Sequence, residues 1–281
     1  MPRRPTAALM RRLDQLVDST DRASRREADP VGFVHRYESA DDQEVVGLIA
    51  ASLAFGNVVA VRRSVQRVLD TLGPAPAEAV DGRSRAQLHR PLKGFVHRVW
   101  KGQHVAAMLA NAGAIRRAHG SLGERFTALA VGAGDLREGL ARFADELRGP
   151  DPDRSLRHLV PDPRAGSACK RLLLYVRWMV RPADGVDLGL WPLDPSRLVI
   201  PVDTHIHRIA KNLGLTERND ASWRTAEEIT AALRTIDPED PVRYDFALCH
   251  LGVSRDCPSR RDPIKCKPCL LRPVCKAYRA G

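Results

Sequence analysis

The spacing of apolar positions along the chain is helical almost throughout. Leu9, Leu13, Leu16 and Val17 predict one amphipathic helix over about residues 5–24. No alternating run is flanked by a hairpin signal, so strands have little support. The pattern therefore predicts an all-α protein, with further helices starting at Asp41 or Asp42 and then spanning Val58–Leu72, Gln103–His119, Leu122–Leu129, Asp135–Leu147, Ala168–Arg181, Thr204–Leu213, Arg224–Ile236 and Val242–Leu251.

Two stretches interrupt this pattern. Residues 73–90 are rich in proline and alanine and are typical of a linker or a short helix. Residues 180–202 form a longer connection that carries several prolines and glycines. Connections of that length within compact domains are often functional, so the second stretch is expected to lie near a site.

Composition limits the class of protein. A chain of 281 residues with 43% hydrophobic residues can build one large domain or two modest ones. No apolar run approaches the ~18 residues of a membrane span, and the N-terminus lacks the apolar core of a secretory signal. We expect a cytoplasmic protein without a membrane partner, in which cysteines stay reduced and clustered cysteines bind metal rather than form disulfides.

The charge of the chain is unevenly distributed. The formal net charge is +11, and residues 255–281 contribute eight Lys or Arg side chains against two acids. A generally basic composition would explain the total charge alone. The concentration of positive charge at the C-terminus favours a polyanionic partner, most simply nucleic acid.

Four cysteines in this basic segment follow the pattern C-x8-C-x2-C-x5-C: Cys257, Cys266, Cys269 and Cys275. Four thiolates on so short a segment can enclose one metal centre and would repel one another without it. Ligation by four thiolates suits a [4Fe-4S] cluster, and zinc is the main alternative.

Two other motifs share the C-terminal half. Lys170 follows a Pro/Gly-rich turn and opens an apolar helix, where it is either a nucleophile or a lysine that contacts solvent or phosphate. The free N–H groups of such a helix start can bind phosphate. Asp203 follows Pro201 and precedes a helix that ends at Gly214. Asp203 is either a helix N-cap or a carboxylate that acts electrostatically, because the helix dipole keeps it ionised.

The string Val202-Asp-Thr-His-Ile-His-Arg-Ile209, followed by four cysteines with basic neighbours, resembles the endonuclease III superfamily of DNA glycosylases. The resemblance extends over roughly residues 41–278, whereas residues 1–40 and 74–100 have no counterpart. The spacing of 33 residues between Lys170 and Asp203 is closer to the archaeal 8-oxoguanine glycosylase branch. Gly166 lies four positions before the lysine, which departs from the compact hairpin of the family.

The resemblance implies a two-lobed helix-hairpin-helix fold with a C-terminal iron-sulfur loop. The central lobe would hold residues 41–159, and the other lobe residues 1–40 and 160–281, with the cluster loop at 253–281. Asp203 would stabilise the positive charge that develops on the sugar, and Lys170 would form a Schiff base in a bifunctional enzyme with AP lyase activity. The four cysteines would ligate a [4Fe-4S] cluster.

The resemblance also implies a substrate. We expect a monomeric, nucleoid-associated base excision repair enzyme that flips a damaged base out of duplex DNA. Phe55 and Asn57 would probe the lesion. The alternatives are a non-catalytic iron-sulfur nucleic-acid-binding protein on the same scaffold and a zinc-bearing interaction module. The expected DNA contacts are Ser167, Lys170, Arg171, Thr204, His205, Arg260, Arg261, Lys265 and Lys267.

Overall fold

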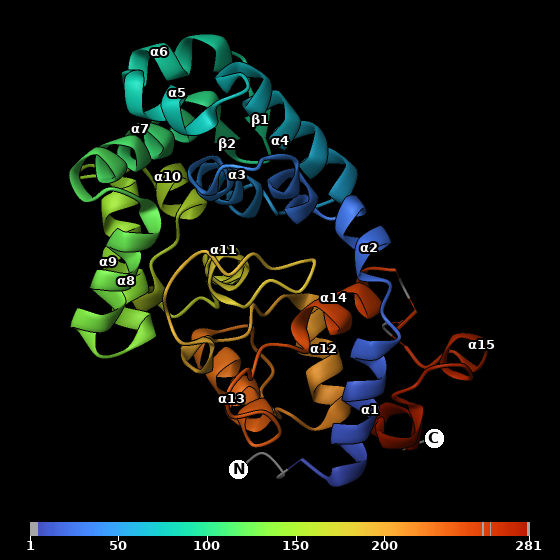
Figure 1. Ribbon diagram of the computed structural model, residues 1–281. Helices are drawn as coiled ribbons and strands as arrows, with labels where there is room; N and C mark the ends of the chain where they lie inside the picture. The colour runs from blue at the N-terminus through green and yellow to red at the C-terminus, as the bar shows by residue number, and fades with distance from the viewer. Residues whose placement is uncertain (1–4, 255, 259, 280–281) are drawn as a thin grey trace. The chain divides into compact units, whose positions relative to one another are not determined.

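The computed structural model describes residues 5–254, 256–258 and 260–279 and is mostly helical, which confirms the all-α class (Figure 1). Its chain divides into two compact units, which are described separately. Unit 1 comprises residues 1–22, 166–173 and 194–281, and unit 2 comprises residues 23–165 and 174–193. Arg255, one of the cations counted above, lies outside the described residues.

Unit 1 consists of helices from both ends of the chain. Figure 1 shows α1 beside α14, and α14 also packs on α12. Gly252 permits this packing, because a Cβ atom at that position would lie 2.6 Å from the Cβ of His205. The elements are α1 (Ala7–Asp18), η4 (Pro195–Arg197), α12 (Thr204–Leu213), α13 (Trp223–Arg234), α14 (Asp245–Val253), α15 (Pro263–Cys266), η5 (Arg272–Val274) and α16 (Lys276–Arg279).

Unit 2 contains the rest of the regular structure. Helix α11 (Lys170–Val180) begins in unit 1 and continues into unit 2. The other elements are α2 (Arg22–Ala28), η1 (Pro30–Arg36), α3 (Ala40–Ser52), α4 (Val58–Leu72), α5 (Pro76–Gly82), α6 (Arg85–His89), η2 (Arg90–Leu92), β1 (Val96–His97), β2 (Trp100–Lys101), α7 (Gly102–His119), α8 (Leu122–Ala133), α9 (Leu136–Arg148), α10 (Arg154–Leu159) and η3 (Pro163–Ala165).

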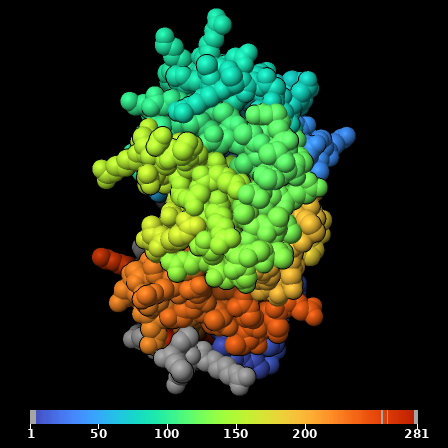
Figure 2. All heavy atoms as spheres, turned by 90° about the vertical axis from the view of Figure 1, so that its left-hand side faces the viewer, coloured from blue at the N-terminus to red at the C-terminus, as the bar shows by residue number. Residues whose placement is uncertain are grey.

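The core of unit 2 is organised around Trp191. Its ring lies 5.1 Å from that of Phe126 and 5.0 Å from that of Tyr175. Its indole N–H donates to the buried carboxylate of Glu44, which also accepts the N–H groups of Leu122 and Gly123 at the start of α8. One buried carboxylate thus ties together α3, α8 and the chain that follows α11. Helices α8 and α9 lie side by side and present a continuous green surface in Figure 2.

A short hairpin was not expected from the sequence. Strands β1 and β2 pair antiparallel, with His97 opposite Trp100 and the turn at Arg98 and Val99. His97 Nδ1 lies 2.9 Å from Ser64 Oγ on α4, and its Nε2 lies 3.2 Å from the carbonyl oxygen of Phe55. The ring of one buried histidine therefore fixes the hairpin to α4 and to the loop before it.

The predicted helices agree with the structure except near the N-terminus. The bounds of α4 and α12 were predicted to the residue. The single helix expected over residues 5–24 is divided, because Ser19 and Thr20 direct their hydroxyl groups to the carbonyl of Leu16. Residues 73–90 hold two short helices, which agrees with the second of the two interpretations given for that stretch.

None of the helices in the described residues is both long and apolar enough to cross a bilayer.

Candidate functional site

The turn before α11 sets the position of Lys170. Gly166 and Cys169 both have positive φ angles, of 86° and 46°. The backbone of Gly166 accepts the N–H of Trp223, and the hydroxyl group of Ser167 accepts the N–H of Cys169. These bonds fix the turn against the start of α13, so Lys170 enters the first turn of α11 in a defined orientation.

Asp203 uses its two carboxylate oxygens differently. Oδ1 accepts the N–H groups of His205 and Ile206, both at 2.9 Å, and so caps α12. Oδ2 lies 3.3 Å from Nζ of Lys170. Asp203 therefore fits both interpretations, with Oδ1 as the N-cap and Oδ2 as the charged oxygen beside Lys170.

The Lys170–Asp203 ion pair is only partly withdrawn from solvent. The lysine side chain is 27% exposed and the aspartate side chain 20%. Burial would raise the pKa of Asp203, but the Lys170 ammonium and the N–H group of Ile206 outweigh it and hold that pKa below its ordinary value. The carboxylate is thus ionised at neutral pH beside a cation and within reach of solvent.

The two histidines that follow are held differently. His205 Nδ1 is buried and has no hydrogen-bond partner among the described residues, and the ring lies against Gly252. His207 Nε2 lies 2.9 Å from the carbonyl oxygen of Arg218. Both histidine side chains are partly buried.

The residues that we expected to contact DNA fall into two groups by exposure. Ser167 and Thr204 are exposed, as are the four cations of the cysteine segment, Arg260, Arg261, Lys265 and Lys267. Arg171 is half-buried, and burial lowers its pKa to about 10. It is the least accessible guanidinium of the set.

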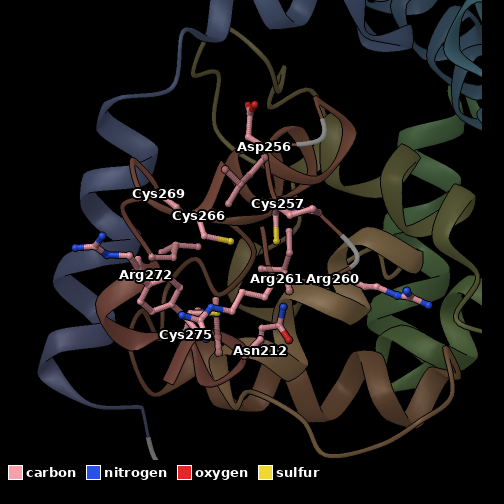
Figure 3. Close-up of a pocket in the computed structure, with 16 residues that line it drawn as sticks. Asn212, Asp256, Cys257, Arg260, Arg261, Cys266, Cys269, Arg272 and Cys275 are labelled. Atoms are coloured by element: carbon pink, nitrogen blue, oxygen red, sulfur yellow. The ribbon is translucent and has the colours of Figure 1, made fainter. Parts of the chain in front are cut away.

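The four cysteines of the C-terminal segment line one cavity (Figure 3). The wall also includes Ile209, Asn212 and Leu213 from α12, the helix that Asp203 caps. In Figure 3 the sulfur atoms of Cys257 and Cys266 point into the same space. The four thiols are not joined by disulfides.

Burial and the neighbouring thiols both oppose ionisation of Cys257 and Cys269. Burial raises the pKa of Cys257, Arg208 lowers it, and the neighbouring Cys269 and Cys275 raise it further. Burial also raises the pKa of Cys269, which the backbone N–H groups of Leu271 and Arg272 lower. Within the described ranges no three metal-ligating side chains already stand close enough to hold an ion. Four thiols around one cavity are the type of donor set that metal clusters use.

Arg208 is a site residue that our sequence reasoning passed over. Its Nη2 donates to the carbonyl oxygen of Cys257 at 2.6 Å, while its buried Nε has no partner among the described residues. Because Arg208 lies on α12, one guanidinium connects the helix of Asp203 to the first cysteine. The one sequence signal for this role of Arg208 is its position in the Val202–Ile209 string that contains Asp203.

In unit 2, Phe55 and Asn57 lie in the loop between α3 and α4. The Phe55 side chain is 41% exposed. The side-chain oxygen of Asn57 accepts the N–H groups of Val59 and Ala60 and caps α4. Both residues are on the surface, and the carboxamide oxygen of Asn57 is engaged in the cap.

Comparison with known proteins gives one match. Neither the curated proteins nor the solved structures contain a match to this chain. A family model described as a protein of unknown function (DUF2400) matches residues 29–254, which hold α3 to α14 and both Lys170 and Asp203. The match extends over most of the chain, which therefore belongs to the DUF2400 family.

Proposed function

We propose that this protein is a DNA glycosylase that excises a damaged base, with Asp203 and Lys170 at its reactive centre. The observation that carries the proposal is the distance of 3.3 Å between Lys170 Nζ and Asp203 Oδ2. The two residues are far apart in sequence, and each is the one that the resemblance to endonuclease III assigns to the chemistry. The helix-hairpin-helix arrangement and the iron-sulfur loop belong to the same proposal.

Both side chains have suitable chemistry for a reaction at C1′ of a nucleotide. Breaking the N-glycosidic bond leaves positive charge on the sugar, and a fixed carboxylate stabilises that charge. Asp203 is fixed by two backbone N–H groups on Oδ1, which leaves Oδ2 directed toward Lys170. The cap therefore orients the carboxylate without consuming the oxygen that would face the sugar.

Lys170 supplies the nucleophile in the bifunctional form of the reaction. Its ammonium group must first lose a proton, which passes through Asp203 Oδ2 to solvent, so that the carboxylate is ionised again when the sugar charge develops. The nitrogen then bonds to C1′ as the glycosidic bond breaks, and the base departs with that electron pair and takes up a proton. Opening of the sugar ring converts the adduct to a Schiff base, from which strand cleavage follows.

We also propose that Cys257, Cys266, Cys269 and Cys275 hold a [4Fe-4S] cluster. The cluster would supply a structural and electrostatic centre that arranges the exposed cations of this segment toward phosphates. Purified protein should show broad visible absorbance and contain about four iron atoms per chain. Colourless protein with one zinc ion per chain would contradict the iron assignment.

Excision is tested with duplexes that each carry one damaged base, under single-turnover conditions. Wild type should release at least one base. Asp203→Asn should lower that rate by about 10²- to 10³-fold, as expected on loss of a fixed electrostatic group, while it still binds DNA. Asp194→Asn is the matched control, because Asp194 also caps a short helix in unit 1 through Ser196 N. An Asp203→Asn enzyme as fast as wild type would remove Asp203 from the chemistry.

The second candidate is a non-catalytic nucleic-acid-binding protein. The exposed cations Arg260, Arg261 and Lys267 favour it, since binding to phosphates needs no reaction. In that case the Lys170–Asp203 pair would only hold two segments of unit 1 together. Salt-dependent DNA binding without release of any base from the panel would support this candidate over the first.

A further inference from the structure

The hairpin of unit 2 presents exposed apolar side chains where a soluble domain would ordinarily place polar ones. Nine large apolar side chains are exposed in the described part of the chain, and five belong to this region. Val96 and Val99 are 61% and 57% exposed on the hairpin. The others, Phe55, Val58 and Val59, belong to the loop and first turn of α4.

The Phe55 loop and the hairpin touch. The guanidinium carbon of Arg98 lies 5.2 Å from the centre of the Phe55 ring. On its other sides the ring contacts Trp100 and His158, both with ring centres 5.8 Å away. Trp100 donates its indole N–H to His158 Nδ1 at 3.1 Å. The exposed phenyl ring is therefore held in place by a cluster of rings behind it.

Arg98 occupies an unusual backbone position. It is at the first turn residue of the hairpin with φ of 59°, a conformation that glycine adopts at no cost. A non-glycine residue there costs about 1–2 kcal/mol. The turn thus carries a cation at a position where glycine would be more stable.

The two segments that carry these apolar groups have charged side chains of one sign. Residues 53–67 and 83–101 contain nine Lys or Arg residues and no Asp or Glu. Lys93, Arg98 and Lys101 are exposed on the hairpin and its flanks, and none of the three forms an ion pair within the described residues. Exposed aromatic and aliphatic groups beside uncompensated cations match a ligand that combines flat apolar faces with negative charge.

We propose that this hairpin surface, formed by Phe55, Val96, Arg98, Val99 and Lys101, binds unpaired nucleotides of nucleic acid. A base would stack on the exposed Phe55 ring or the exposed valines of the hairpin, and the adjoining phosphates would contact Arg98 and Lys101. Base faces are available only where a strand is unpaired, which is why the proposal names single-stranded or unpaired segments rather than regular duplex. The inference extends the nucleic-acid contact expected of Phe55 to the whole hairpin surface, and it needs neither Lys170 nor Asp203.

The test is fluorescence anisotropy of the full-length protein with a labelled single-stranded oligothymidine over a range of salt concentrations. Arg98→Gly should fold at least as stably as wild type, because glycine relieves the positive φ. It should bind more weakly, and the slope of log affinity against log salt should become shallower by about 0.7, the value for one single-strand phosphate contact. Phe55→Ala should weaken binding by about 5- to 100-fold, as for loss of one stacked base.

Arg224→Ala is the matched control, since Arg224 is an exposed arginine on α13 of unit 1. It should bind as wild type does. Arg98→Gly and Phe55→Ala proteins that both bind like Arg224→Ala would overturn the proposal. So would a wild type that ignores the oligonucleotide and binds vesicles of anionic lipid. A failure of base excision leaves these binding differences untouched, and a failure of the binding test leaves excision untouched.

Discussion

Substitution of Asp203 by asparagine separates the two interactions of this side chain. Asparagine is as good an N-cap as aspartate, so its side-chain oxygen can still accept the N–H groups of His205 and Ile206. The charge opposite Lys170 is lost. Alanine removes both interactions, and the difference between the two variants isolates the cap.

The expected magnitudes follow from the geometry. Two unit charges at 3.3 Å attract by roughly 5 kcal/mol at an effective dielectric constant near 20. Desolvation of the partly buried pair offsets most of this, and pairs with comparable exposure contribute about 1 kcal/mol or less. Asp203→Asn should therefore lower the free energy of unfolding by at most about 1 kcal/mol. Asp203→Ala should lose about 1 kcal/mol more with the cap.

Urea denaturation followed by far-ultraviolet circular dichroism measures both values. Because the chain has two units, a two-state free energy of unfolding is derived only if independent probes give coincident transitions. A Lys170→Met variant in both backgrounds completes a double-mutant cycle for the ion pair. If Asp203→Asn and Asp203→Ala were equally destabilised, the described division of the two oxygens would be refuted.

Three further outcomes follow from the structure. The pKa of Asp203 is lowered in the folded state, so its ionised carboxylate contributes fully to the free energy of unfolding above the unfolded pKa of about 3.9. That contribution is lost as pH falls through the folded pKa. The stability difference between wild type and Asp203→Asn should therefore be constant near neutral pH and vanish in acid. Glu44→Ala should cost about 3 kcal/mol or more in urea denaturation, because it leaves three buried N–H donors unsatisfied, whereas the exposed Glu78→Ala should be nearly neutral. Cys269→Ser should lose bound iron in elemental analysis, whereas Cys249→Ser, outside the four-cysteine set, should keep it.

The helices whose ends carry clear capping residues were predictable from the sequence. Asp203 and Gly214 mark the two ends of α12 as an N-cap and a left-handed C-cap, and the structure uses both in that way. Asn57 likewise caps the start of α4, and Gly73 ends that helix with a positive φ of 84°. Local backbone chemistry decides such boundaries, so a single sequence contains the information.

Features that depend on distant contacts were not predictable. Strands β1 and β2 have two residues each, and their turn lacks glycine or asparagine, so nothing local marks a hairpin. His97 holds it through Ser64 and Phe55, which are far away in sequence. The role of Arg208 likewise depends on where the chain brings Cys257.

The candidate site was predictable only in part. Lys170 and Asp203 were selected as separate motifs, each with an ordinary structural explanation. Their contact depends on the turn at Gly166, which is fixed by the backbone of Trp223. The approach of the lysine to the carboxylate is a property of the fold of unit 1, and no spacing in the sequence specifies it.

The most direct test of a shared reactive centre is borohydride trapping with DNA that contains an abasic site. Wild type should form a covalent adduct, and peptide mapping should place it on Lys170. Lys170→Ala should give none, and Asp203→Asn should still bind the DNA but trap it more slowly. An adduct on another residue, or wild type that binds abasic DNA without forming any adduct, would contradict the assignment of Lys170 as the nucleophile beside Asp203.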